Sequence, residues 1–168
     1  INLHAYNSII ENVNVHHMGG KGWVVESIFK KKDPETGGYY IPSHATLDYD
    51  TVIFINCDAS YCMDSIGRSG LGDDFGDYAD GFWINPENIK SYYKLIGCRS
   101  WMNADDGYDL PGYAYLDINS CWAWNNGHLE TGIGEGFRNM KQNRVTNCIS
   151  VYNKAQGFTE GYNNTPWS

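Results

Sequence analysis

The stretch Lys94-Leu95-Ile96-Gly97-Cys98 decides the fold, because its pattern returns along most of the chain. It is a short run of apolar or β-prone residues, then a small residue suited to a turn, then a cysteine or valine. Four further segments follow the same pattern: Ile9-Ile10-Glu11-Asn12-Val13, Val52-Ile53-Phe54-Ile55-Asn56-Cys57, Asp117-Ile118-Asn119-Ser120-Cys121 and Val145-Thr146-Asn147-Cys148. Repeats of one short pattern predict a solenoid, in which each copy occupies the same place in successive turns.

The spacing of the cysteines indicates the type of solenoid. Cys98 and Cys121 are 23 residues apart, and Cys121 and Cys148 are 27 apart. One turn of a parallel β-helix takes about that many residues, within the range of about 20–45 for solenoid repeats. We therefore expect an all-β parallel β-helix, with these cysteines in an inward column where they pack as small hydrophobes. The distance from Cys57 to Cys98 is 41 residues, which predicts a long loop over 65–78 on one side of the solenoid.

Two further structural expectations follow from the repeats. Three copies continue through an aromatic residue and an asparagine to a glycine, so Asn103, Asn125 and Asn153 are expected to stack at a bend. Their side-chain amides would then bond from turn to turn, in a structural role. Cys57 and Cys62 are close enough in sequence to form a local disulfide, and the sequence leaves that pairing open.

Composition limits the classes of function. A chain of 168 residues is long enough for one domain with a real core, and we expect a single domain over 1–168. The formal net charge is −8 with no basic stripe, which argues against a nucleic-acid partner. No apolar run approaches membrane-spanning length, so we expect no membrane partner. We interpret the chain as a mature or trimmed segment of a secreted protein. Open strand edges at its ends predict a longer parent chain or end-to-end self-association.

A group of carboxylates marks the candidate site. Asp105, Asp106 and Asp109 lie within five residues, and Asp80 lies one turn upstream. Residues one turn apart in a solenoid are about 5 Å apart, so Asp80 can sit beside the other three. Carboxylates held that close raise each other's pKa unless a cation binds them, and Ca²⁺ accepts about six to eight oxygen ligands. From spacing alone, a solvated acidic loop is the alternative.

Several motifs between Tyr78 and Asn164 resemble those of the family 9 polysaccharide lyases, which are calcium-dependent pectate lyases built on a right-handed parallel β-helix. The motifs are Ala79-Asp80-Gly81-Phe82, the run from Cys98 to Leu110, Trp122-Ala123-Trp124-Asn125-Asn126-Gly127, Gly134-Glu135-Gly136-Phe137-Arg138 and Asn153-Lys154-Ala155-Gln156-Gly157-Phe158. The resemblance implies Ca²⁺ as cofactor, with Asp80, Asp105, Asp106 and Asp109 as its ligands. It also implies a secreted, extracellular lyase that cleaves a pectin-type acidic polysaccharide, polygalacturonate or rhamnogalacturonan, by β-elimination.

The sequence departs from the family at its catalytic position. Arg138 stands where the family has a lysine base after the Gly-Phe pair, and Gln156 replaces another usual lysine. Arg138 is the candidate catalytic residue, as a base, and the alternatives are a clamp for a substrate carboxylate or an ion pair with Glu135 or a nearby aspartate. Candidate substrate-binding residues are Arg99, Lys154 and Lys141. The arginine favours an alternative function, a non-catalytic calcium-dependent carbohydrate-binding or structural β-helix segment.

Overall fold

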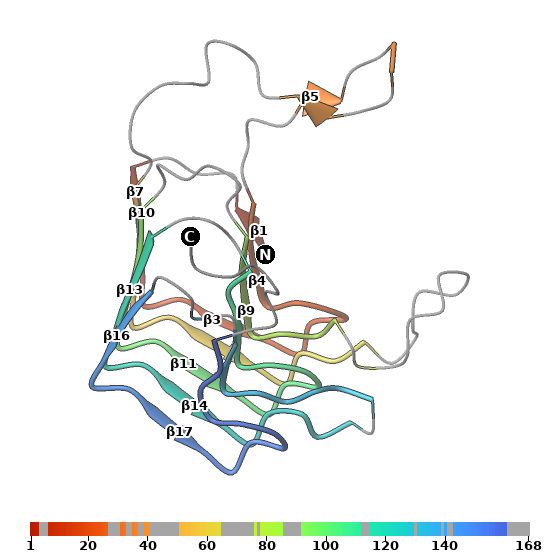
Figure 1. Cartoon of the computed structure of the whole chain (residues 1–168), viewed down its shortest axis with the longest axis vertical. Helices are drawn as coiled ribbons and strands as arrows, with labels where there is room; N and C mark the ends of the chain where they lie inside the picture. Colours follow the sequence, from red (N-terminus) through yellow and green to blue (C-terminus); the bar gives the residue numbers. More distant parts are fainter. Residues whose placement is uncertain are drawn as a thin grey trace, which may run out of the picture.

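The computed structural model describes residues 1–3, 7–26, 31–32, 35–36, 39–40, 51–64, 76, 78–85, 92–111, 115–129, 131–138, 140 and 143–160. In this part of the chain the regular structure is entirely strand, and it includes no helix long and apolar enough to cross a membrane. Successive turns are stacked from the N-terminal to the C-terminal end (Figure 1). The all-β class expected from the repeats is confirmed.

Three parallel sheets form the walls of the solenoid. Sheet A contains β1 (Asn2–Leu3), β4 (Trp23–Glu26), β9 (Phe82–Asn85), β12 (Tyr108–Asp109) and β15 (Phe137–Arg138). Sheet B contains β2 (Ser8–Glu11), β7 (Thr51–Ile55), β10 (Tyr92–Ile96), β13 (Tyr115–Asn119) and β16 (Arg144–Thr146). Sheet C contains β3 (Asn14–His16), β8 (Asp58–Ser60), β11 (Arg99–Trp101), β14 (Trp122–Trp124) and β17 (Ile149–Val151). A separate antiparallel pair joins β5 (Lys31–Lys32) to β6 (Tyr39–Tyr40).

Each turn runs through sheet B, then sheet C, then sheet A. The repeated segments found in the sequence all fall on sheet B, where their central residues stack in register. Leu95, for example, pairs with Phe54 on one side and Ile118 on the other. The predicted parallel β-helix is therefore confirmed. The loop predicted over 65–78 falls largely outside the described residues.

The corner between sheets B and C explains the small residue in the repeat. One residue per turn there has a positive φ, at Asn12 (57°), Asn56 (51°), Gly97 (63°), Ser120 (55°) and Asn147 (54°). Asparagine and glycine tolerate this left-handed conformation far better than most residues do. The turn residue of each repeat therefore occupies the left-handed backbone position between the sheet B strand and the sheet C strand.

The residues that follow this corner form the predicted cysteine column. Cys57, Cys98 and Cys121 are buried, Cys148 is half-buried, and all are free thiols. Cys62 is also a free, buried thiol, so the disulfide left open by the sequence is not formed. It lies at a different corner, where its backbone N–H donates to Asn103 Oδ1 at 3.1 Å.

The asparagine ladder is real, but one of its members was predicted wrongly. Asn103 Nδ2 donates to Asn126 Oδ1 at 2.9 Å, and Asn126 Nδ2 donates to Asn153 Oδ1 at 2.9 Å. Asn126, not Asn125, therefore takes the middle place. The pairing of Trp101 with Trp124 fixes the register and places Asn125 beside Met102. Asn125 and Met102 both have positive φ, at 52° and 55°, and form the turn itself.

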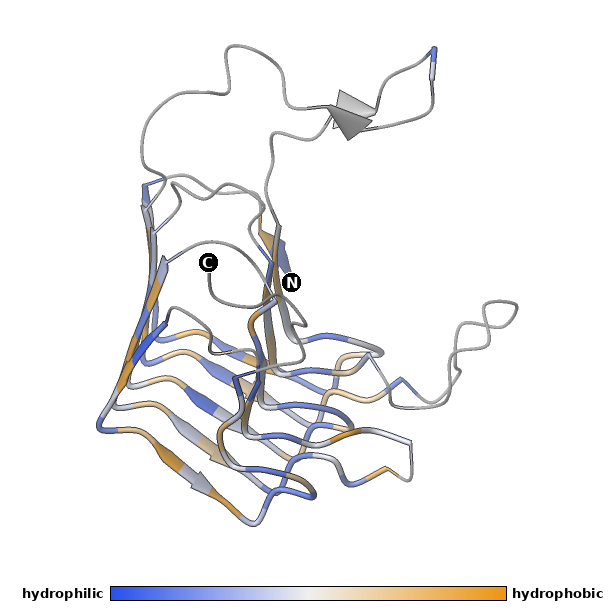
Figure 2. Ribbon diagram, viewed as in Figure 1, coloured by the Kyte–Doolittle hydropathy of each residue, from blue (hydrophilic) through white to orange (hydrophobic). Residues whose placement is uncertain are grey.

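An aromatic column fills the interior beside sheet A. It consists of Trp23, Phe82, Tyr108, Phe137 and Phe158, whose successive ring centroids are 6.2, 4.9, 4.5 and 5.0 Å apart. The first four are buried, and Figure 2 shows hydrophobic residues along the strands and hydrophilic ones at many corners. A glycine precedes each ring. A Cβ at Gly107 would lie 2.7 Å from the Gly136 carbonyl oxygen, so only glycine allows the turns to approach this closely.

Candidate functional site

The residue before each of these glycines belongs to a second column, which runs past the start of sheet A. Its members are Lys21, Asp80, Asp106, Glu135 and Gln156. Backbone hydrogen bonds fix their alignment, because Gly22 N donates to the Asp80 carbonyl and Gly81 N to the Asp106 carbonyl, both at 2.9 Å. Gly107 N donates to the Glu135 carbonyl at 2.9 Å, and Gly136 N to that of Gln156 at 3.0 Å. We call this the charge column.

A third column on sheet A lies beside the charge column. Asp109 on β12 pairs in register with Trp83 on β9 and with Arg138 on β15. The side chain of Asp109 is half-buried, as is that of Arg138. This pairing brings a second carboxylate of the Asp105–Asp109 segment to the charge column.

Three carboxylates meet where these columns adjoin. Asp80, Asp106 and Asp109 each offer an oxygen atom, and those oxygens lie within 4.8 Å of one another. We call these three residues the carboxylate cluster. Asp80 and Asp106 are almost completely buried, at 2% and 0% exposed. A buried set of hard oxygen donors fits a divalent cation such as Ca²⁺.

Burial and mutual repulsion make the charged form of the cluster unfavourable. Burial, followed by the charges of Asp109 and Asp105, raises the pKa of Asp80 well above its ordinary value. The pKa of Asp106 is raised to about 8, first by burial and then by the charge of Asp105. The Glu135 N–H and the Arg138 charge offset only part of that rise. A bound cation would favour the ionised form of both groups.

Asp105, the fourth predicted ligand, lies outside the set of mutually close oxygens. It is buried, and its Oδ1 accepts a hydrogen bond of 2.7 Å from the Ile133 backbone N–H. That contact ties the Asp105 turn to the following turn of the chain. Its charge still acts on the cluster, because it raises the pKa of both Asp80 and Asp106.

Arg138 lies against the cluster. Its Nη1 donates to Asp106 Oδ2 at 3.1 Å, and its Nε lies 3.7 Å from Glu135 Oε2. The ion-pair alternative predicted for Arg138 is therefore present in the structure. Burial alone would lower the pKa of Arg138, but the charges of Asp106 and Asp109 and the hydrogen bond to Asp106 raise it above its ordinary value.

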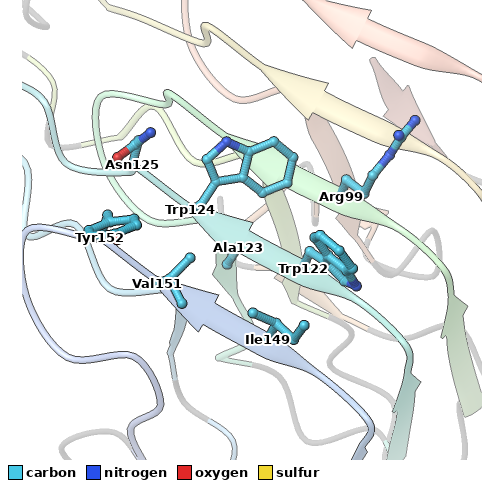
Figure 3. A pocket seen from close by; sticks show the side chains of 8 residues that line it. All are labelled: Arg99, Trp122, Ala123, Trp124, Asn125, Ile149, Val151 and Tyr152. Atoms are coloured by element: carbon cyan, nitrogen blue, oxygen red, sulfur yellow. The ribbon is translucent and has the colours of Figure 1, made fainter.

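The predicted substrate-binding residues lie elsewhere. Arg99 is on sheet C, where its Nε and Nη2 donate to the two carboxylate oxygens of Asp58. It borders a hollow of about 450 Å³, together with Trp122 and Ile149 of the neighbouring strands (Figure 3). Lys154 Nζ donates to the carbonyl of Leu129 at 3.1 Å and to that of Gly132 at 2.7 Å. Lys141 lies outside the described residues. A substrate-binding role stays a prediction for all three.

Sequence reasoning missed Lys21, the N-terminal member of the charge column. Its Nζ lies 3.5 Å from Asp80 Oδ2, and its side chain is 15% exposed. A signal was present in the sequence, because in each of the five charge-column turns the column residue is followed by a glycine and an aromatic residue. These triplets are Lys21-Gly22-Trp23, Asp80-Gly81-Phe82, Asp106-Gly107-Tyr108, Glu135-Gly136-Phe137 and Gln156-Gly157-Phe158.

The stacked parallel sheets and the acidic site on one corner define a protein of the parallel β-helix class. Residues 1–167 match the family described as the Pel9A-like, right handed beta helix region, and the chain belongs to that family. The right-handed parallel β-helix expected from the sequence is thereby confirmed. The resemblance to family 9 pectate lyases is confirmed as well.

Individual relatives agree with this assignment. Pectate lyase L of Dickeya dadantii (strain 3937) is 26% identical over 88% of this chain and 40% of its own length. Pectate lyase L of Thermoclostridium stercorarium is 36% identical over 41% of this chain and 7% of its own length. The crystal structure of pectate lyase Pel9A superposes with a TM-score of 0.62 at 26% identity, over 91% of this chain and 34% of that one. The chain thus spans well under half the length of these relatives.

Proposed function

We propose that the chain is part of a secreted, calcium-dependent polysaccharide lyase that cleaves pectin-type uronic-acid polymers by β-elimination. The observation that carries the proposal is the carboxylate cluster, with Arg138 Nη1 3.1 Å from Asp106. Membership of a family that includes proteins named pectate lyase supports the reaction type. Because pectin-type polymers lie outside cells, an extracellular site of action follows from the substrate.

The proposed ligands of a calcium ion are Asp80, Asp106 and Asp109. Asp105 is proposed as a fourth acidic group, farther from the ion than these three. The raised pKa values of Asp80 and Asp106 support this assignment, because they show how much the cluster disfavours three uncompensated charges. Bound calcium would supply positive charge to the uronate carboxylate and so stabilise the enolate-like charge that develops there. By holding the ion, the ligand residues would place that carboxylate at the start of sheet A.

The reaction itself requires a base close to the bound sugar. The base removes the proton at C5 of the uronate, the C5–H electrons form a C4–C5 double bond, and the C4–O bond breaks. The departing oxygen keeps the bonding pair and takes up a proton. Arg138 is our candidate for this base, because its guanidinium lies at the cluster. An arginine must first lose its own proton, and its raised pKa makes alkaline pH a requirement.

A second function is favoured by the contacts of Arg138. Its pairing with Asp106 and its proximity to Glu135 both stabilise the charged guanidinium, which would act as a clamp for a substrate carboxylate. The chain would then be a non-catalytic, calcium-dependent carbohydrate-binding or structural β-helix segment.

We also propose a single domain over 1–168. Among the described residues, β16 and β17 are edge strands of sheets B and C, which supports end-to-end association or continuation of the solenoid in a longer chain.

The test is the absorbance of the unsaturated product with polygalacturonate and with rhamnogalacturonan. Each is assayed at alkaline pH with calcium and then with a chelator. A calcium-dependent rise in absorbance is expected on at least one polymer, and Arg138→Ala should abolish it. Arg144→Ala is the matched control, because Arg144 is an exposed arginine on sheet B, and this variant should retain activity.

Arg138→Lys separates a base from a clamp. Because lysine loses its proton at lower pH than arginine, a base role predicts an active variant with a lower pH optimum. An unchanged optimum would assign the clamp role. Calcium-dependent binding of either polymer without any absorbance change would move the proposal to the non-catalytic function.

A further inference from the structure

Lys21 lies beside the carboxylate cluster and has no role in the proposed reaction. It lies in the turn before β4, one turn away from Asp80 toward the N-terminal end. Trp23 N donates to the Gly81 carbonyl at 2.8 Å, which holds this turn directly against the Asp80 turn. Lys21 is therefore the neighbour of Asp80 in the charge column on the side opposite Glu135 and Arg138. It is the cation at the N-terminal edge of the carboxylate cluster.

Two aromatic rings accompany the Lys21 ammonium. Its Nζ lies 4.7 Å from the centroid of the Tyr78 ring and 4.9 Å from that of the Trp83 ring. Tyr78 is 39% exposed, and Trp83 pairs in register with Asp109 of the cluster. A cation between two partly exposed rings, directly beside the carboxylates, combines the two features that recognise an acidic sugar. One is a donor for its carboxylate, and the other is a flat apolar surface for its ring.

The polar contacts of Lys21 are long. Nζ lies 3.5 Å from Asp80 Oδ2 and donates to the Tyr78 carbonyl at 3.4 Å. Typical N–H···O bonds are about 2.7–3.2 Å, and an ammonium has three N–H groups to offer. The cation is therefore held mainly by the local negative field and the rings, and it can turn toward a new acceptor.

Metal binding at Asp80 increases the need for such an acceptor. A carboxylate that binds a divalent cation has less charge left to attract Lys21, and the two cations repel each other. A substrate carboxylate next to Lys21 would restore the balance. This step rests on the proposed function, because it takes Asp80 as a calcium ligand.

We propose that Lys21, Tyr78 and Trp83 form a binding subsite for the uronate residue next to the one at the carboxylate cluster. Lys21 donates to the uronate carboxylate, and an aromatic ring packs against the sugar. Successive turns of the solenoid are about 4.8 Å apart, which is close to the length of one sugar in a polymer. A chain that lies along the charge column therefore brings its next sugar to the Lys21 turn.

The test is titration calorimetry of the 168-residue chain with monomeric galacturonate and tetragalacturonate in excess calcium. Lys21→Met should weaken tetragalacturonate binding roughly tenfold, the value of one charge-assisted hydrogen bond. Monomeric galacturonate, which can fill only the position at the cluster, should be affected much less. Lys21→Arg should restore most of the affinity for tetragalacturonate. Calcium affinity, measured without sugar, should be retained or increased in Lys21→Met because a repelling charge is gone.

Lys94→Met is the matched control, since Lys94 lies on β10 of sheet B, and it should bind both sugars as the unaltered chain does. Equal tetragalacturonate affinity in the unaltered chain and Lys21→Met would overturn the subsite alone. Loss of calcium binding in Lys21→Met would also overturn it, because Lys21 would then support the cluster and not the sugar. If the unaltered chain binds neither sugar, the proposed function fails and the subsite with it.

Discussion

The aromatic column and the charge column are two residues apart in every turn, yet they follow opposite rules. In the aromatic column similar rings stack at 4.5–6.2 Å, and each added turn adds a favourable contact. At the same spacing like carboxylates repel, and the pKa values of Asp80 and Asp106 are raised accordingly. The charge column is therefore not acidic throughout, because Lys21 comes before Asp80 and Gln156 comes after Glu135. Stacking of similar residues stabilises the interior, whereas the candidate site lies where the stacked residues differ in charge.

The largest expected effect comes from breaking the aromatic column. Tyr108 is fully buried, and its ring centroid lies 4.9 Å from that of Phe82 and 4.5 Å from that of Phe137. Tyr108→Ala should lower the free energy of unfolding by about 3–5 kcal/mol, measured by urea denaturation. Tyr108→Phe is the control. It keeps the ring but loses the hydroxyl bond to the Trp122 carbonyl, and should lose only about 1 kcal/mol. Equal losses would show that the stacking contributes little.

Neutralising a carboxylate should have opposite effects inside and outside the cluster. In calcium-free buffer, Asp80→Asn should raise the free energy of unfolding by about 1 kcal/mol or more, because a buried, repelled charge is removed. Asp58→Asn should lower it by about 1 kcal/mol, because Asp58 pairs with the half-exposed Arg99 guanidinium. Urea denaturation of both variants provides the measurement. A loss of stability in Asp80→Asn would mean that its pair with Lys21 outweighs the repulsion.

The raised pKa of Asp106 predicts an unusual pH dependence. Its pKa is about 8 in the folded chain against an ordinary value of 3.8, so between these values the folded state binds more protons than the unfolded state. The contribution of Asp106 to stability is therefore fully present at low pH and is lost as pH rises toward about 8. Melting temperatures recorded with a chelator should fall over this interval. Excess calcium should reverse the fall, and Asp106→Asn should flatten it; a flat profile in the unaltered chain would contradict the assignment.

The smallest effect is expected on sheet C, whose outer face also carries aromatic residues. Trp122 is 48% exposed, and its ring meets that of Trp124 edge-on with the centroids 6.5 Å apart. Because about half of Trp122 is exposed to solvent, Trp122→Ala should change the free energy of unfolding by less than about 1 kcal/mol. Calcium affinity should be unchanged. A large loss of stability would mean that outer rings contribute as inner ones do.

Sequence reasoning reached most of the fold because the repeat encodes it locally. At the corner between sheets B and C a positive φ recurs at residues that tolerate it, such as Asn56 and Gly97, and the cysteine after each of these two is buried. Register was harder to predict, since Trp124-Asn125-Asn126 offers two adjacent asparagines and only strand pairing shows that Asn126 continues the ladder.

For the site, sequence reasoning predicted Asp80, Asp106 and Asp109, which meet, and Arg138, which lies beside them. Asp105 Oδ1 accepts a hydrogen bond from the Ile133 backbone N–H, and sequence spacing carries no information about that contact. Lys21 was not predicted, because the site prediction was based on the carboxylates and not on the residue-glycine-aromatic triplet. Strand register places Lys21 in the same column as the acidic residues.

Calcium titration calorimetry of the chelator-treated chain tests the central claim most directly, namely that the carboxylate cluster is a calcium site. We expect one ion per chain, with affinity reduced at least roughly tenfold in Asp109→Asn and unchanged in Asp117→Asn, a control on sheet B. Absence of calcium binding by the unaltered chain, or equal affinity in Asp109→Asn, would contradict the account.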